Sequence, residues 1–312
     1  MRGLQRVVCT LPEAAAERVG AAVGGLVGAP LGIRREVVRA NLRLAFPEQS
    51  EAWVERLARA SYRHLGREAA VMMRLPMLSA EEIRARTHLD GWDEVLAAVE
   101  RGRGVILATG HLGNWEVAAA SVAVRGLPIA AVVRRQGNRL FDAHLDATRR
   151  RLGVETIAQR EARHAVPRIL QAGGVVALVA DQDVRERGVF APFFGRLAST
   201  ARGPALFALR HGAALFACAA LRRPGEEPAY DIAGRPVPVQ PTGDLEADVW
   251  RVTAELNARL EAVIRLRPEQ YFWFHKRWKT PAPPELRRPV AGTNRPAGDA
   301  GRRADGAAPL DG

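Results

Sequence analysis

A histidine and a glutamate stand five positions apart in ATGHLGNWEVAAA, residues 108–120. The stretch follows the apolar run GVILATG and leads into small helix-forming residues, so a strand is expected to end here and a helix to begin. The imidazole of His111 titrates near neutral pH and can take a proton from an attacking hydroxyl. The carboxylate of Glu116 can fix the tautomer of that imidazole and stabilise the imidazolium. Because glycine and asparagine bend easily, the spacing predicts that the two side chains meet.

The same pair also has a purely structural interpretation. His111 would then close a strand, and Glu116 would stand in the first turn of a helix, where a carboxylate is favoured. His-x4-Glu is a weak motif when taken alone, so both interpretations stay open at this point.

A second informative block is ADQDVRERGVFAPFFGRLASTARGPALFALRHGA, residues 180–213. It begins where the apolar run VVALVA ends, so Asp181 and Asp183 are expected at the same rim of a sheet as His111. The aromatic loop VFAPFFG is able to line an apolar groove; the alternative is a loop that faces the core.

A third block is PEQYFWFHKRWKT, residues 268–280, in which aromatic residues interleave with cations. Such a mixture suits a membrane interface and also nucleic acid. The alternative is a terminal strand whose residues are alternately buried.

Several other chemistries lack their motifs. The chain has no G-x-S-x-G nucleophile elbow, no G-x-x-x-x-G-K-[ST] loop and no dinucleotide-binding glycine fingerprint. Asp142, His144 and Asp146 are possible metal ligands, but alternate positions do not share one face of a helix. We therefore expect no metal site.

A recurring pattern predicts the elements that must position these groups. In residues 92–109, 163–181 and 203–222, a helical stretch ends in glycine and a continuous apolar run follows. Strands that are apolar throughout are buried on both faces, which predicts an α/β fold with a mixed, mostly parallel sheet flanked by helices. Residues 50–65 have helical spacing behind Ser50 as N-cap, and residues 244–265 read as another amphipathic helix.

We accordingly expect three segments. Residues 1–90 form a helical N-terminal segment that associates with a membrane, and residues 91–280 form the α/β core. Residues 281–312 hold six prolines, five glycines and no aromatic residue, so a disordered tail is predicted there.

Composition limits the partners. The 312 residues carry a net charge of +12, and almost all of the basic residues are arginines, which favours anionic partners. Two cysteines are too few for a disulfide scaffold or a thiolate metal site. The longest uncharged run, Val19 to Ile33, has 15 residues with five glycines, whereas a spanning helix needs about 20 apolar residues. A shallow interfacial segment and an ordinary buried helix both remain possible.

Together these residues resemble one family. GRGVILATGHLGNWE, DQD…GVFAPFFGRLAST and PEQYFWFHKRWKT are similar, in this order, to motifs of the bacterial lipid A biosynthesis acyltransferases, the late enzymes that add secondary acyl chains. These belong to the lysophospholipid acyltransferase-like superfamily. NLRLAFPEQS and VVRRQGNRLFDAHLDATRRRLG resemble two further family regions, so the similarity runs from about residue 35 to 280.

The resemblance implies a glycerol-phosphate-acyltransferase-like fold and an O-acyltransferase of lipopolysaccharide biosynthesis. Such an enzyme moves a fatty acyl group from an acyl carrier protein or coenzyme A thioester to a hydroxyl of a glycolipid such as a lipid A precursor. It needs no cofactor beyond this co-substrate. Carried over, His111 is the general base and Glu116 its charge partner.

The family match also suggests substrate-binding residues and a location. Arg149 in TRRRLG matches a family arginine thought to serve the active site, and Arg134 and Asp181 match positions near it. Asp183 is counted with them because it follows the same apolar run. The family often has a spanning N-terminal helix; the glycine-rich run here favours peripheral or shallow attachment at the cytoplasmic face of the inner membrane.

No serine or cysteine nucleophile is evident, so direct attack of the hydroxyl on the thioester is the simplest mechanism. Arginines at the rim would suit both the phosphates of a glycolipid and an acidic carrier protein. Two alternatives remain: the same chemistry on another acceptor (a lysophospholipid, an aminolipid or a phosphatidylinositol mannoside), or a non-catalytic membrane- or nucleic-acid-binding module. Nucleic acid is not the expected partner.

Overall fold

The structure is a computed structural model that describes residues 5, 8–135, 137–225 and 228–286. Contacts divide the chain into two units, Met1–Pro281 and Ala282–Gly312. The central sheet and the helices around it belong to the first unit. Of the predicted tail, residues 287–312 lie outside the described part of the chain.

Helices and strands alternate through most of the first unit. The helices are α2 (Glu13–Gly28), α3 (Arg35–Ala45), α4 (Glu51–Arg74), α5 (Ala80–Ala85), α6 (Trp92–Glu100), α7 (Trp115–Ala123), α8 (Arg139–Arg151), α9 (Ala162–Gln171), α10 (Gly203–His211) and α11 (Leu245–Leu266). The strands are β1 (Thr87–Asp90), β2 (Val105–Gly113), β3 (Ile129–Val133), β4 (Val154–Ala158), β5 (Val175–Val179), β6 (Val189–Phe193), β7 (Arg196–Thr200), β8 (Ala214–Arg222) and β9 (Tyr230–Val237).

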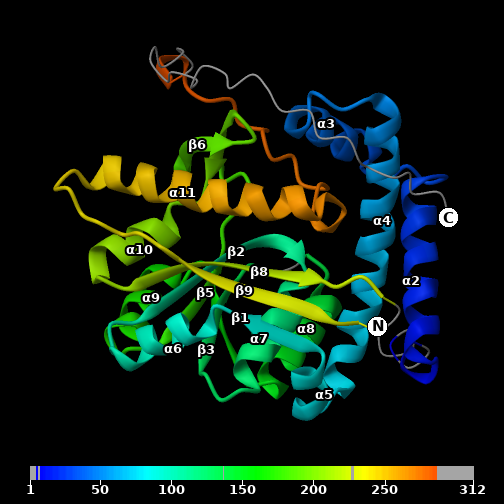
Figure 1. The fold of residues 1–312 in the computed structure, drawn as a ribbon, viewed down its shortest axis with the longest axis horizontal. Coiled ribbons are helices and arrows are strands. Elements are labelled where there is room, and N and C mark those ends of the chain that lie inside the picture. Colours follow the sequence, from blue (N-terminus) through cyan, green and yellow to red (C-terminus); the bar gives the residue numbers. More distant parts are fainter. Residues whose placement is uncertain (1–4, 6–7, 136, 226–227, 287–312) are drawn as a thin grey trace, which may run out of the picture. The chain divides into compact units, whose positions relative to one another are not determined.

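Seven strands form one sheet in the order β1-β9-β8-β2-β5-β3-β4 (Figure 1). Every neighbouring pair is parallel except β8 and β9. The three helix–glycine–strand units of the sequence are α6–β2, α9–β5 and α10–β8, which place three apolar strands side by side at the centre. The predicted α/β fold with a mixed, mostly parallel sheet is confirmed.

Each face of the sheet is covered by its own set of helices. Residues of α9, α10 and α11 pack with one set of strand residues around Ile106 and Val176. Residues of α4, α5, α6 and α7 pack with the other set, around Leu107 and Phe216. Because both faces are covered, all of β5 and the first four residues of β2, Val105 to Ala108, are apolar, as expected for strands inside a parallel sheet.

The N-terminal helices are joined closely to the rest of the unit. Helix α4 begins as predicted behind Ser50, whose side chain accepts a hydrogen bond from Trp53 N–H. Residues of α3 and α4 share a core with the β6–β7 hairpin and with Trp273. Asn41 of α3 donates to the carbonyls of Trp273 and His275, at 2.7 and 2.6 Å.

Glycine spacing explains the packing of α2. Gly20, Gly24 and Gly28 lie four residues apart on one face of α2 and meet Gly66 and Tyr62 of α4. A Cβ atom at Gly24 would overlap the carbonyl oxygen of Tyr62, and one at Gly66 would overlap that of Gly20. These glycines therefore allow two helix backbones to approach more closely than larger residues would permit.

The opposite side of α2 and the turn after it expose large apolar side chains: Val19, Val23, Leu26, Leu31 and Ile33, each at least half exposed. Among the described residues, none of the helices has the length and apolar character needed to cross a bilayer. The predicted membrane association of residues 1–90 stays a prediction. The last residues of that segment form β1, an edge strand of the central sheet.

Candidate active site

His111 lies near the end of β2, and Asp181 follows β5, its parallel neighbour. The ring Nδ1 of His111 lies 2.7 Å from Asp181 Oδ1, and the backbone N–H of His111 donates to Oδ2 at 2.8 Å. Asp181 is buried, whereas the His111 side chain is 23% exposed. With Nδ1 engaged by the carboxylate, Nε2 is the nitrogen that can take a proton from a bound hydroxyl.

Electrostatics couple the two groups. Burial by itself lowers the pKa of His111, but the charge and hydrogen bond of Asp181 outweigh it, and the pKa is raised above its ordinary value. Burial raises the pKa of Asp181, but His111 outweighs it, so that pKa is lowered. A carboxylate held in its ionised form beside an imidazole is the arrangement that makes the imidazole a stronger base.

The predicted contact between His111 and Glu116 is wrong. Glu116 stands in the first turn of α7, and both of its oxygens accept from Arg149 of α8: Oε2 from Nε at 2.8 Å and Oε1 from Nη2. The physical reason is that the helix begins at once after Asn114, so Glu116 is directed to the neighbouring helix, while Asp181 reaches the imidazole from the next strand. The charge of Glu116 still contributes to raising the pKa of His111.

The other predicted site residues lie in three different surroundings: Arg149 in a buried ion pair, Arg134 at the exposed edge of the sheet, and Asp183 in contact with Thr280. Arg149 is mostly buried through its pair with Glu116. Arg134 is exposed and directly follows β3, so it lies at the same edge of the sheet as His111. Asp183 accepts from Thr280 N–H and Oγ1, at 2.9 and 2.8 Å, so its carboxylate joins the loop after β5 to the C-terminal segment. Substrate binding by Arg134, Arg149, Asp181 and Asp183 stays a prediction.

Residues 268–280 do not form the surface cluster that their composition suggested. Tyr271, Trp273, Phe274 and Arg277 are buried, and only Lys276 and Lys279 are well exposed. The alternative of alternate burial was closer, although Tyr271 makes only an isolated bridge with Leu112 rather than a strand.

Arg277 is a residue of this region that the sequence patterns did not single out. It is 1% exposed, donates to Ser199 O and Thr200 Oγ1 at 2.6 Å each, and lies over the ring of Phe193. Its charge helps to lower the pKa of Asp181. No local sequence signal shows this, because Arg277 is far from Asp181 along the chain and looks like one cation among several.

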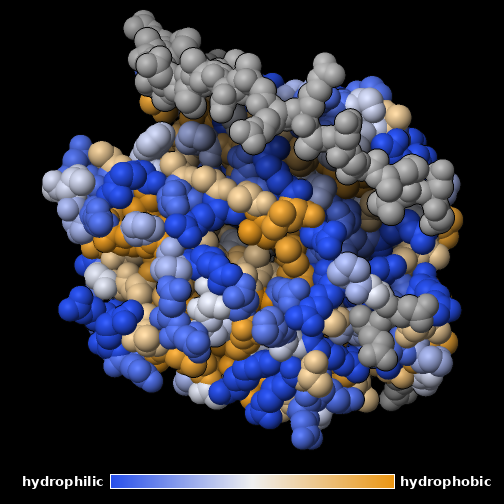
Figure 2. Space-filling model, in the orientation of Figure 1, coloured by the Kyte–Doolittle hydropathy of each residue, from blue (hydrophilic) through white to orange (hydrophobic). Residues whose placement is uncertain are grey.

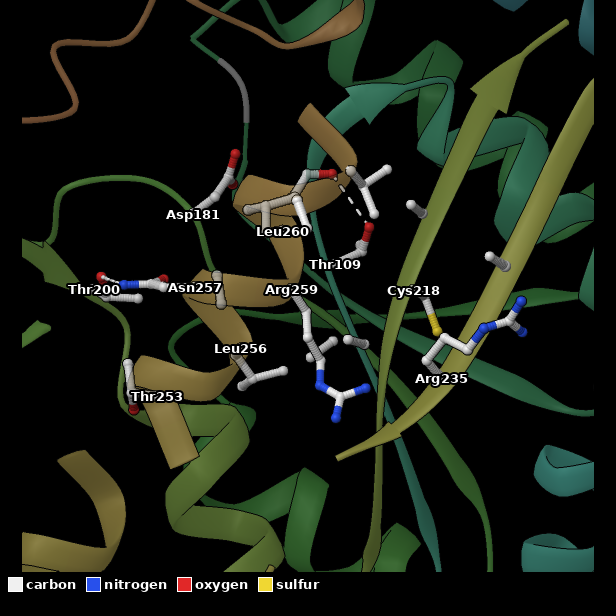
Figure 3. Close-up of a pocket in the computed structure, with 18 of the residues that line it drawn as sticks. Thr109, Asp181, Thr200, Cys218, Arg235, Thr253, Leu256, Asn257, Arg259 and Leu260 are labelled. Carbon is white, nitrogen blue, oxygen red and sulfur yellow. Dashed lines mark hydrogen bonds between the residues drawn. The ribbon is translucent and has the colours of Figure 1, made fainter. Parts of the chain in front are cut away.

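A cavity of about 200 Å³ lies beside the pair, between α11 and the sheet. Leu256 and Leu260 project from α11 toward the strands, with Asp181 at one end and Arg235 at the other (Figure 3). On the surface that carries α11, the molecule is hollowed below this helix, and apolar residues border the hollow (Figure 2). The described residues that line the cavity are mainly small or apolar, and those on the strands include Ala108, Gly110, Ala217, Cys218, Ala219 and Ala233.

Residue size accounts for this space. Ile106 and Leu215 are buried against α10 and α11, but the next residues on the same face, Ala108 and Ala217, are small. At Gly110 a Cβ atom would lie 2.7 Å from Leu260 and 3.2 Å from Asp181. The aromatic stretch at residues 189–195 was expected either to line an apolar groove or to face the core. Phe193 and Phe194 pack into the core that the N-terminal helices share, so for them the second interpretation is correct.

Comparison with known proteins identifies the family of the chain. A family model for bacterial lipid A biosynthesis acyltransferase matches residues 2–280. The lipid A biosynthesis palmitoleoyltransferase of Escherichia coli K12 is 27% identical over 267 residues, 84% of each chain. The phosphatidylinositol mannoside acyltransferase of Mycolicibacterium smegmatis is 27% identical over 281 residues, 88% of each chain. Because the family model spans nearly the whole first unit, the chain belongs to the bacterial lipid A biosynthesis acyltransferase family and is an acyltransferase.

Proposed function

We propose that the protein moves a fatty acyl group from an acyl carrier protein or coenzyme A thioester to a hydroxyl of a membrane glycolipid such as a lipid A precursor. The observation that carries the proposal is the His111–Asp181 pair at the carboxyl ends of parallel strands, where sites of α/β proteins collect. Its geometry suits proton removal from an alcohol.

In the proposed reaction, Nε2 of His111 takes the hydroxyl proton as the hydroxyl oxygen attacks the thioester carbonyl. The new C–O bond forms, the C–S bond breaks, and the imidazolium returns the proton to the departing thiolate. Asp181 stabilises the imidazolium while it exists. Glu116, held by Arg149, adds negative potential without touching the ring.

A cysteine acyl-enzyme has little support. Burial raises the pKa of the Cys218 thiol to about 12, so at neutral pH almost none of it is the nucleophilic thiolate. Direct transfer between two bound substrates is therefore the simpler course. The apolar cavity between α11 and the sheet has the right character for hydrocarbon of a bound substrate.

The location proposed is the cytoplasmic face of the inner membrane, by peripheral or shallow attachment. The exposed apolar side chains of α2 and its following turn support it, because lipid would remove them from water. The net charge of +12 favours anionic lipid headgroups and an acidic carrier protein.

A second acceptor is supported by one comparison. The palmitoleoyltransferase and the phosphatidylinositol mannoside acyltransferase are equally similar to this chain, at 27% identity each. A phosphatidylinositol mannoside is therefore the alternative acceptor, with the same residues acting in the same way.

The test is an acyl-transfer assay with purified protein, acyl carrier protein and coenzyme A thioesters, and vesicles that contain each acceptor, with products identified by mass. We expect one acceptor to gain one acyl mass, and His111→Ala to lower the rate by roughly 10²–10⁴-fold. His88→Ala, an exposed histidine on β1, is the control and should keep the wild-type rate. No acylated lipid from any acceptor, or an unchanged rate in His111→Ala, would contradict the proposal.

A further inference from the structure

Glu68 of α4 is a buried carboxylate outside the catalytic pair, and both of its oxygens have partners. Oε1 accepts from Arg222 Nη1 at 3.2 Å. Oε2 accepts from the Tyr230 hydroxyl at 2.7 Å and from Asn114 Nδ2 at 2.8 Å. Arg222 also donates to Glu17 of α2. We call this set, Glu17, Glu68, Arg222 and Tyr230, the N-terminal network.

Asn114 joins this network to the site. It stands between β2, which carries His111, and α7, which carries Glu116. Its backbone N–H donates to Ala220 O at 3.2 Å, and its Oδ1 accepts from Val117 N–H at 3.1 Å, which caps α7. The orientation of this one side chain therefore fixes how α7 leaves β2.

The turn before Asn114 leaves little freedom. Gly113 has φ of +58°, and a Cβ atom there would overlap Ala220 O. The direction of the first turn of α7 is thus set by few contacts, and the cap made by Asn114 is one of them.

The residue type at position 114 is informative. Serine and aspartate cap helices about as well as asparagine does, since a cap needs only an oxygen acceptor. The amide group of asparagine adds a donor, and here that donor goes to Glu68. The Asn114 side chain thus accepts one hydrogen bond from the helix that carries Glu116 and donates another to the N-terminal network.

We propose that Glu68 is a positioning residue for acyl transfer: through Asn114 it holds the junction of β2 and α7, and with it His111, three residues earlier on β2, in place against Asp181. The proposal rests on the proposed function, in which His111 acts as the base. Glu68 itself contacts neither His111 nor Glu116 through any hydrogen bond in the described part of the chain. Because Glu68 acts through the position of His111 and not through a contact with substrate, we expect its effect on the rate of the chemical step rather than on substrate binding.

The decisive variant is Asn114→Ser, which keeps an oxygen for the cap but removes the amide that reaches Glu68. We expect kcat to fall by roughly 10–100-fold with KM nearly unchanged, because small displacements of catalytic groups have effects of this size. Asn138→Ser is the matched control: Asn138 caps α8 in the same way, and there the substitution should leave kcat unchanged.

A second variant, at Glu68, allows a double-mutant cycle with Asn114→Ser. Glu68→Met, which has no oxygen to accept from Asn114, should lower kcat to a similar extent, and the double variant Glu68→Met with Asn114→Ser should be no slower than either single variant, because both remove the same contact. If the two effects multiply, or if Asn114→Ser changes only the unfolding midpoint and not kcat, the positioning role is wrong.

A readout that needs no acyl transfer keeps this test separate from the proposed function. The imidazole signals of His111, assigned in NMR spectra with the His111→Ala variant, should move in Asn114→Ser and stay in place in Asn138→Ser. Signals that do not move overturn the positioning proposal whatever the assay shows. Signals that move in a protein without acyl transfer support the positioning of His111 and refute only the proposed reaction.

Discussion

Two buried ionic networks in the described part of the chain are built from similar side chains. The N-terminal network has two carboxylates, an arginine and a tyrosine, and the site has two carboxylates, Asp181 and Glu116, with Arg149, Arg277 and His111. Every member of the N-terminal network is at most 4% exposed. In the site, the His111 side chain is 23% exposed while Asp181 behind it is buried.

The difference teaches how a buried charge becomes useful for chemistry. Removing charges from water is unfavourable unless they are paired, and both networks meet that need with pairs. Of the two, only the site leaves a titratable side chain, that of His111, partly exposed to solvent. The N-terminal network instead joins α2 and α4 to β8 and β9, so its pairing is used to hold helices on the sheet.

The largest expected effect tests whether Asp181 is the working partner of His111. Asp181→Asn removes the charge that stabilises the imidazolium, and kcat/KM should fall by roughly 10²–10⁴-fold. Asp231→Asn is the control, because the side chain of Asp231 is 47% exposed and pairs with Arg223. Equal rates in the two variants would mean that the pair does not take part in the reaction.

The next prediction concerns the stability that the N-terminal network provides. Arg222→Met leaves Glu17 and Glu68 buried without their cation, and the free energy of unfolding should fall by about 3–5 kcal/mol. Its neighbour Arg223 pairs with Asp231 at the surface, so Arg223→Met should lower the free energy of unfolding far less than Arg222→Met does. Denaturant unfolding of both variants measures this, and similar losses would remove the distinction between buried and exposed pairs.

The pH dependence of stability tests whether the His111–Asp181 pair is ionic. Because the pKa of His111 is raised, protonated His111 contributes to the free energy of unfolding. This contribution is complete below the ordinary pKa of 6.5 and is lost as pH rises through the raised pKa. Because the pKa of Asp181 is lowered, its contribution is present above 3.8 and is lost as pH falls through the lowered pKa. The loss of stability in His111→Ala should therefore be greater at pH 5 than at pH 9, measured by denaturant unfolding. A loss independent of pH would show that the pair is not ionic.

The smallest expected effect concerns Glu116. If it acts only through its charge, Glu116→Gln should move the acidic limb of the kcat/KM profile to lower pH by less than about one unit, because the raised pKa of His111 loses one contribution. Leu140→Ala, an exposed position on α8, is a control that should leave the limb in place. A loss of activity as large as that of Asp181→Asn would instead restore Glu116 as the direct partner of the base.

Local patterns predicted the elements well because helices and buried strands depend on neighbouring residues. The helix–glycine–strand units and the cap at Ser50 are where spacing placed them. Asp181 was expected at the same rim of the sheet as His111 because both follow apolar runs, and the parallel strands do bring them together. The β2 strand continues through His111 to Gly113, beyond the apolar run that predicted it.

Partners across the fold were beyond such patterns. Spacing alone linked His111 with Glu116, since it cannot show that β5 lies beside β2 or that α8 brings Arg149 to Glu116. It also could not show that Arg277 is buried near Asp181 or that Asn114 reaches Glu68, contacts that join residues far apart in the chain.

The sequence by itself determined which groups can do chemistry here and at which strand ends they stand, because residue type and local periodicity are properties of short segments. Which carboxylate holds the imidazole, and which helix holds the other carboxylate, was decided only by the tertiary structure. The order of strands in the sheet is set by the packing of the whole core, and a hydrogen bond depends on a few ångströms that no spacing along the chain specifies.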